Sequence, residues 1–202
     1  MTHTTEYYYN DDTKTLTFHN LFNDTLTEIV FPALVKSIKF GYWFDQPIDF
    51  ITFPSKLLSI AFGHYFKRSL DTTIFPDSLQ TLRLGYEFDH SLDAVTFPKN
   101  LKNIIFGYWF QRSIDKVTFP DSLRSIIFAE PYNQPINNLP RNLTHITFHN
   151  ISPENLTNLP IALKRIKIMN SHYNIDEIRI PYGCTVVNKR NKKFEVIKHP
   201  IK

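Results

Sequence analysis

Hydrophobic residues recur along this chain with a period of 22 residues. The dipeptide Phe-Pro marks the period at Phe31-Pro32 and returns four more times at that spacing, followed by three variants at steps of 20 or 21 residues. Counted forward from each proline, the third place holds Leu or Val, the sixth Ile or Leu, and the eighth mostly Phe. Because self-similarity at such a period is typical of repeat architectures, we predict a solenoid.

Each repeat predicts one short strand followed by an irregular return. Side chains alternate along a strand, so the sixth and eighth places face the same side, which we assign to the core. The proline cannot donate a ladder hydrogen bond and therefore lies outside the sheet, and the glycine at the ninth place permits a positive φ after the strand. The pattern predicts an all-β, right-handed parallel β-solenoid with ~22 residues per coil and about eight coils.

The aromatic residues follow the same phase. Sixteen of the 18 phenylalanines fall on the eighth, twelfth and twenty-first places, which indicates core packing and not a cofactor site. A single repeat buries too little apolar surface to fold alone, so the stack needs capping ends. We expect residues 1–11 to form an N-terminal cap with Tyr7, Tyr8 and Tyr9 over the first coil, residues 12–182 to form the solenoid, and residues 183–202 to form a C-terminal cap strand and basic tail.

The basic segment 188–193 has two interpretations. It resembles a nuclear-localisation or nucleic-acid-binding patch. Phe194 to Ile197 then resembles one more strand, beside which lysines guard against edge-to-edge aggregation. We favour capping.

Residues 44–48 (Phe-Asp-Gln-Pro-Ile) and 132–136 (Tyr-Asn-Gln-Pro-Ile), each followed by the Pro-x-x-Leu-x-x-Ile-x-Phe run, resemble the FNIP repeat, a relative of the leucine-rich repeat. The resemblance covers roughly residues 12–170. Departures from the family's proline occur at Ser69, Ser91 and Ser113. The resemblance implies a protein-interaction module of a family common in social amoebae and in large DNA viruses that infect amoebae. Longer members carry an N-terminal F-box that docks a ubiquitin ligase. About eleven residues precede the first coil here, so we expect no F-box, and a ligase link is unsupported.

The outward strand positions are basic. Over eight repeats the fourth, fifth and seventh places hold nine Lys or Arg and no Asp or Glu. They form either a solvated sheet surface or an interaction surface that selects an acidic partner by charge complementarity. Tyr42, Tyr86 and Tyr108 at the tenth place, with His64, are expected to line its rim, because Tyr is favoured at interfaces. The predicted partner-binding residues are Lys36, Lys39, Arg83, Lys102, Arg124, Lys164, Arg165, Lys167, Tyr42, Tyr86 and Tyr108.

Two further features leave alternatives open. Trp43 and Trp109 are either rim anchors or loop packing. A ladder of carboxylates runs through Asp49, Asp71, Asp93 and Asp115. We expect each carboxylate to accept backbone N–H groups within its own turn; a calcium ladder is the alternative, although the Gly-rich Asp motifs that it would need are missing.

Composition narrows the class of protein. The 202 residues carry a net charge of +4 with one cysteine, Cys184, at a Leu place where we expect a buried thiol. The sequence contains no apolar run of about 18 residues, so no membrane-spanning helix is predicted. Met1 to Glu6 do not resemble a signal peptide. The sequence holds no nucleotide-binding, hydrolase or zinc-protease motif. We predict no catalysis, no cofactor and no metal.

Together these observations predict a monomeric, intracellular and cytoplasmic scaffold (in the host cytoplasm if the chain is viral) that binds an acidic protein through its basic strand face. The alternative is nucleic-acid binding by the same face, with the Tyr rings stacking on bases. Phosphate-driven binding weakens steeply with salt, which separates the two.

Overall fold

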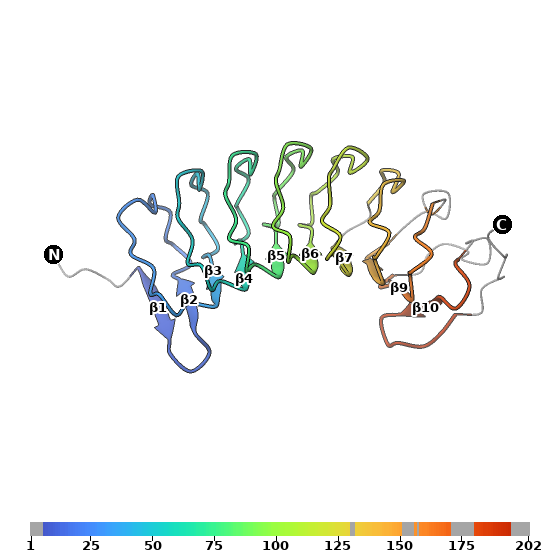
Figure 1. Ribbon diagram of the computed structural model, residues 1–202. Coiled ribbons are helices and arrows are strands. Elements are labelled where there is room, and N and C mark those ends of the chain that lie inside the picture. Colours follow the sequence, from blue (N-terminus) through green and yellow to red (C-terminus); the bar gives the residue numbers. More distant parts are fainter. Residues whose placement is uncertain (1–5, 130–131, 151–155, 157, 171–179, 195–202) are drawn as a thin grey trace.

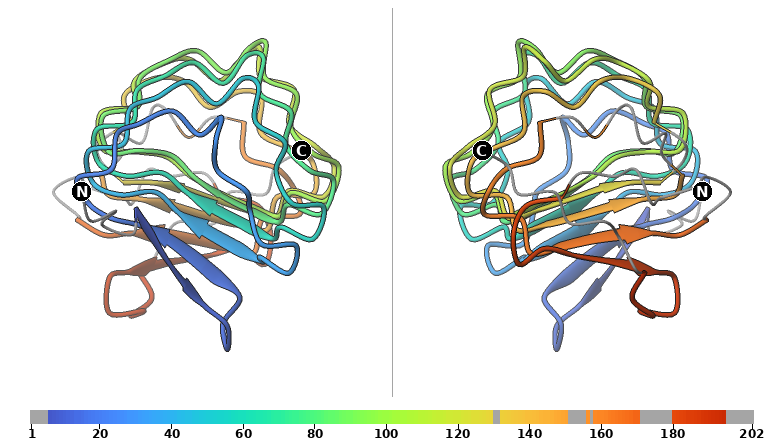
Figure 2. Two further views of the ribbon diagram at one scale, coloured as in Figure 1. Left: turned by 90° about the vertical axis from the view of Figure 1, so that its left-hand side faces the viewer. Right: turned by 90° about the vertical axis from the view of Figure 1, so that its right-hand side faces the viewer.

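The chain coils into an arch of stacked turns in this computed structural model (Figure 1), which describes residues 6–129, 132–150, 156, 158–170 and 180–194. The strands line the inner, concave side of the arch and the irregular returns form its outer side. Viewed from either end, the coils superimpose on one another (Figure 2). The described residues contain no helix. The predicted all-β parallel solenoid is confirmed.

Ten strands form one sheet whose order follows the sequence. They are β1 (Tyr7–Asn10), β2 (Thr15–Phe18), β3 (Ser37–Lys39), β4 (Ser59–Ala61), β5 (Thr81–Arg83), β6 (Asn103–Ile105), β7 (Ser125–Phe128), β8 (His145–Phe148), β9 (Arg165–Ile168) and β10 (Thr185–Asn188). β1 pairs with β2 in antiparallel orientation, and every later pair is parallel. The strands make about seven turns, where the sequence predicted about eight; residues 171–179 of the last coil lie outside the described residues.

The sixth place of the repeat sets the register of the parallel strands. Leu16 pairs with Ile38, and Ile38 pairs with Ile60. The same pairing of sixth-place residues continues from strand to strand as far as Val186 in β10. These residues are at most 1% exposed. Register is strongly specified because a slip of one residue would move each of them to the solvent face.

Stacked phenylalanines fill the interior. The twelfth place forms a continuous column from Phe22 to Tyr132, in which successive ring centroids lie 5.9–6.4 Å apart. The eighth place forms a second column, interrupted at Leu84, with centroids 4.8–5.4 Å apart. The columns meet where Phe62 and Phe66 stack at 3.9 Å. The side chains of both columns are buried, which confirms the assignment of the eighth and twelfth places to the core. At the twenty-first place Phe53, Phe75 and Phe97 are buried, whereas Phe31 and Phe119 are partly buried against the core.

The repeated prolines each open a tight turn. The carbonyl of Pro54 accepts the N–H of Leu57 at 3.0 Å, and the equivalent bond recurs in coil after coil. The ninth-place glycines have a different role from the predicted one. Among the glycines of the described residues only Gly183 has a positive φ, at 80°. A Cβ at Gly63 would instead overlap the carbonyl of Gly41 in the preceding coil. These glycines are needed for the close approach of successive backbones.

Polar side chains join the returns of neighbouring coils. Asp45 accepts the backbone N–H of Lys67 at 3.0 Å and forms an ion pair with Arg68 at 3.0 Å. Asp89 makes the equivalent contacts with Gln111 and Arg112 at 3.0 Å each. These contacts join two pairs of neighbouring coils on their outer side as well as through the sheet.

The Asp ladder is built differently from the prediction. The backbone N–H groups of Asp71, Asp93 and Asp115 donate to the hydroxyl of the serine two residues earlier, at 3.2 Å. The serines that replace the family's proline therefore make the turn, and the carboxylates do not. Asp49 accepts the hydroxyl of Thr72 in the next coil at 2.7 Å.

Both ends of the sheet close with a hairpin. β1 and its turn at residues 11–14 precede β2, and Tyr7 packs edge-on against Phe18. After β10 the chain turns through residues 189–192, so that Lys193 forms an antiparallel bridge with Val187. The predicted strand at 194–197 falls mostly outside the described residues; Phe194 donates its N–H to Val186 at 2.9 Å.

Candidate protein-interaction surface

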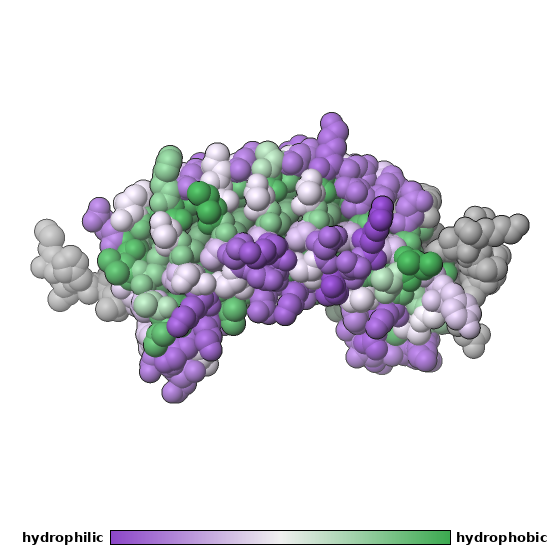
Figure 3. Space-filling view, viewed as in Figure 1, coloured by the Kyte–Doolittle hydropathy of each residue, from purple (hydrophilic) through white to green (hydrophobic). Residues whose placement is uncertain are grey.

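The concave side of the arch displays the fifth and seventh places of the repeat; we call this surface the strand face. Between its two projecting ends the arch is hollowed (Figure 3). Lys39 and Arg83 are exposed on β3 and β5, and Arg165 and Lys167 lie on β9. The fifth place is mostly Ser or Thr.

The centre of the strand face is apolar, with Ile105 and Ile127 half-buried on β6 and β7. The face is thus basic on both sides of a small apolar centre.

The fourth-place bases lie beside this face and not on it, since each strand begins at the fifth place. Lys36, Lys102, Arg124 and Lys164 directly precede β3, β6, β7 and β9 and are exposed. Arg124 donates to the carbonyls of Asp121 and Leu123 at 2.6 and 3.0 Å. Lys102 donates to the amide oxygen of Gln80 at 3.2 Å. These contacts orient the two cations but leave their charges without a carboxylate.

Ion pairing differs between the strand face and the returns. Within the described part of the chain, none of the eight predicted basic site residues forms an ion pair. In the returns, Arg68, Lys99 and Arg112 each contact an Asp at 2.7–3.0 Å, and Lys67 contacts Glu87 at 3.7 Å. The positive potential of the concave side is therefore not neutralised within the described residues.

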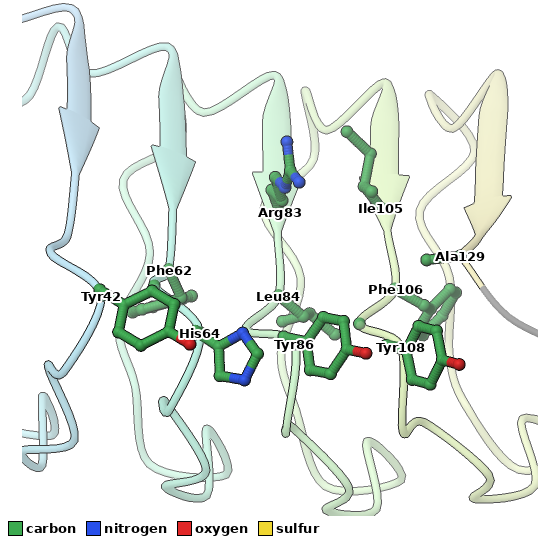
Figure 4. A pocket seen from close by; sticks show the side chains of 12 residues that line it. Tyr42, Phe62, His64, Arg83, Leu84, Tyr86, Ile105, Phe106, Tyr108 and Ala129 are labelled. Atoms are coloured by element: carbon green, nitrogen blue, oxygen red, sulfur yellow. The ribbon is translucent and has the colours of Figure 1, made fainter.

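Four stacked rings border the strand face just beyond the strand ends (Figure 4). Tyr42, His64, Tyr86 and Tyr108 follow β3 to β6, and their successive ring centroids lie 4.6, 4.2 and 4.4 Å apart. Stacking of this kind adds to the stability of each coil contact. Tyr42 and Tyr86 are 42% and 37% exposed, so they remain available to a partner. The predicted rim of tyrosines exists, with His64 completing the row; we call it the ring ladder.

A shallow hollow of about 230 Å³ lies between the ring ladder and the strand face. Arg83 and Ile105 project over it from two neighbouring strands (Figure 4), and Leu84 and Phe106 form its apolar floor. Arg83, Tyr86 and Tyr108 are among the residues predicted from the sequence, whereas the apolar contribution of Ile105 was not predicted. The sequence does contain a signal for Ile105: an Ile occupies an outward strand place at which most repeats carry a polar or basic residue.

The structure does not bring every predicted residue to this hollow. Lys164, Arg165 and Lys167 belong to β9 and its approach, four strands from β5, or about 19 Å at the usual strand spacing. Of the two roles predicted for Trp43, the structure favours packing between returns, because its ring stacks on Tyr65 at 4.2 Å. The Trp43 side chain is still 45% exposed. Trp109 meets Tyr108 edge-on and is 58% exposed.

Reactive chemistry is sparse in the described residues. They contain no group of three or more His, Cys, Asp or Glu side chains placed to hold a metal ion. They also contain no helix long and apolar enough to cross a membrane.

Cys184 is 1% exposed, and burial raises the pKa of its thiol to about 11. Since only the thiolate is a nucleophile, we expect the native thiol to react with a disulfide reagent at pH 8 far more slowly than in the denatured chain. The unfolded thiol ionises near 9.0. The unfolded state therefore loses its proton first, and stability should fall as pH rises from 9 towards 11. Equal reaction rates of the native and denatured chains would refute this.

Comparison with known proteins identifies the family of this repeat. The FNIP repeat model matches residues 22–65, 44–87, 66–109, 88–131 and 110–151. The chain belongs to the FNIP repeat family. Its fold is similar to the crystal structure of CroV588, described as a novel circular LRR protein and coming from a giant virus, with a TM-score of 0.65 and 28% sequence identity over 91% of this chain. This FNIP chain spans 31% of the length of that protein.

A leucine-rich repeat protein from Bacteroides ovatus matches with a TM-score of 0.21 and 14% identity, covering 89% of this chain and 61% of that chain, which is too distant to support an argument. No curated protein matches the chain. The FNIP repeat solenoid is consistent with a non-catalytic repeat scaffold.

Proposed function

We propose that this FNIP chain is a non-catalytic scaffold that captures an acidic polypeptide in its concave side, centred on the hollow beside Arg83. The strand face supplies the charge, and the ring ladder supplies a polar-tipped aromatic border. The partner's carboxylates would pair with the free cations, while one of its apolar side chains would cover Ile105.

One observation carries the proposal: nine basic residues and no acidic residue occupy the fourth, fifth and seventh places. Within the described residues only Lys14, at the N-terminal end, is in an ion pair, and the other eight are not. A surface that served only for solubility gains nothing from a single sign of charge, since mixed charges serve as well. A one-signed concave surface attracts a partner of opposite sign and raises its association rate.

The apolar centre favours a polypeptide over a nucleic acid. Ile105 and Ile127 occupy the outward places of two adjacent central strands, between Arg83 and the bases of β9. A phosphate backbone would place charge against these isoleucines, whereas an acidic peptide also carries apolar side chains that can cover them. The exposed rings of Tyr42 and Tyr86 favour nucleic acid as the second candidate, because bases stack on such rings.

Fluorescence anisotropy separates these two partners. A labelled oligoglutamate peptide carrying one Leu should bind more tightly than a labelled oligothymidylate of equal charge. Binding of the peptide should also weaken less than the ~10³–10⁵-fold that phosphate-driven binding loses between ~50 and ~200 mM salt. Tighter binding of oligothymidylate with that steep dependence would replace the proposal with the nucleic-acid candidate. No binding of either probe would reject both.

We also propose an intracellular, cytoplasmic location. The support is the single cysteine of the sequence, because chains of oxidising compartments commonly carry paired cysteines.

A further inference from the structure

The two ends of the arch carry opposite charge. The first coil and its hairpin, residues 6–35, contain five acidic side chains and one Lys or Arg. All five acidic side chains are exposed: Glu6, Asp11, Asp12, Asp24 and Glu28. At the other end, residues 158–202 carry ten basic and three acidic side chains. Seven of the bases lie in the described ranges 158–170 and 180–194: Lys164, Arg165, Lys167, Lys189, Arg190, Lys192 and Lys193. The solenoid is therefore polarised along its axis, which a net charge of +4 does not reveal.

The most strongly charged parts of both ends lie on the same side of the arch. The acidic turn at 11–14 and the basic turn at 189–192 both project beyond the concave sheet (Figure 1). The first contains the ion pair of Asp11 with Lys14 at 2.7 Å, which leaves Asp12 unmatched. Within the described residues no ion pair involves the four bases at 189–193. A second copy placed in line with the first would bring turns of opposite sign to the same side.

Both ends also expose apolar side chains. Leu21 and Leu34 of the first coil are 72% and 51% exposed. Leu21 occupies the place at which Trp43 and Tyr65 of the next two coils stack on each other, but no described coil precedes it. At the other end, Ile161 and Tyr182 follow the prolines of two consecutive coils and are 86% and 94% exposed. Each end thus combines apolar contact area with one sign of charge, as interfaces do.

We propose that the acidic N-terminal end of one copy of this chain binds the basic C-terminal end of a second copy, head to tail. Such a contact is heterologous: it joins two different surfaces, so it can repeat from copy to copy. It is separate from partner capture, because it uses the ends of the arch and not the strand face. The predicted monomer is then the form at high salt, where these charges are screened. The sequence left capping and nucleic-acid binding as alternatives for the basic segment 188–193. In the head-to-tail contact this segment binds the acidic end of a second copy.

Sedimentation velocity of the purified full chain tests the proposal. At about 0.01 M salt, where the Debye length is ~30 Å, the chain should sediment as species larger than a monomer, and at about 1 M, where it is ~3 Å, as a monomer. A monomer at both salt concentrations, up to the solubility limit, would overturn it.

Charge reversal identifies the surfaces. Asp12→Lys with Asp24→Lys spares the Lys14 ion pair, and Lys189→Glu with Arg190→Glu reverses the other end. Each double variant alone should be monomeric at low salt. An equimolar mixture should associate again, because one variant keeps the basic end and the other keeps the acidic end. If either variant associates as the wild type does, or if the mixture stays monomeric, the head-to-tail contact is wrong. The triple variant Arg83→Glu, Lys102→Glu and Arg124→Glu should still associate, which separates this failure from failure of the proposed function.

Discussion

Phe66→Ala is expected to lower the free energy of unfolding by about 3–5 kcal/mol, a large fraction of the total stability of a typical domain. The Phe66 side chain is fully buried and stacks on Phe62 at 3.9 Å, with Phe44 and Phe88 on either side at 6.0 and 6.4 Å. Removal of the ring would leave a cavity that breaks the column between two coils. Because stability in a solenoid depends on contacts between neighbouring repeats, the effect should reach beyond one coil. Urea unfolding followed by circular dichroism measures it.

Phe50→Ala is the matched control. The same side chain is removed, but Phe50 is 93% exposed in the return between β3 and β4, and it is one of the two phenylalanines outside the three repeated places. Its effect should stay within about 0.5 kcal/mol. A loss below about 1 kcal/mol for Phe66→Ala would mean that the aromatic columns do not hold the coils together.

The sequence predicted the fold well because the repeat constrains it many times over. Places that bury Ile38 and Phe44 recur in coil after coil, so one phase accounts for the strands, the register and the core. Periodicity reveals which side chains face inward. It does not reveal why a small residue is required, and the prediction for Gly63 was wrong: the need is for room beside the Gly41 carbonyl, which is a contact between coils.

The candidate site was predicted in part. Arg83 and Tyr86 were identified from outward places and from the known preference of interfaces for Tyr. Their meeting with Ile105 at one hollow depends on the way neighbouring coils stack, which single repeats do not encode. The Asp ladder failed for a similar reason. In this turn the backbone N–H of Asp71 donates to the Ser69 hydroxyl, and the N–H of Thr73, which an Asx turn would direct to the Asp71 carboxylate, donates to the carbonyl of Leu70.

Reversal of three bases is expected to abolish partner capture. Arg83→Glu, Lys102→Glu and Arg124→Glu together reverse the charge at the hollow, which Arg83 lines, and along the fourth-place border of the central strands, where Lys102 and Arg124 lie. An acidic peptide would then meet repulsion where it met attraction, so its affinity should fall by at least about 100-fold, close to 2.7 kcal/mol. All three side chains are exposed, and Lys102 and Arg124 form hydrogen bonds at the surface. The free energy of unfolding should therefore change by no more than about 0.5 kcal/mol.

The matched control is Lys56→Glu, Lys116→Glu and Arg141→Glu, which changes the net charge equally at exposed positions outside the strand face and its borders. Anisotropy of the labelled oligoglutamate peptide with the wild type and both triple variants tests the central claim most directly. We expect the control to bind within a few-fold of the wild type while the strand-face variant shows the full loss. Equal weakening of both variants would reduce the effect to net charge, and undiminished binding by the strand-face variant would show that the peptide docks elsewhere.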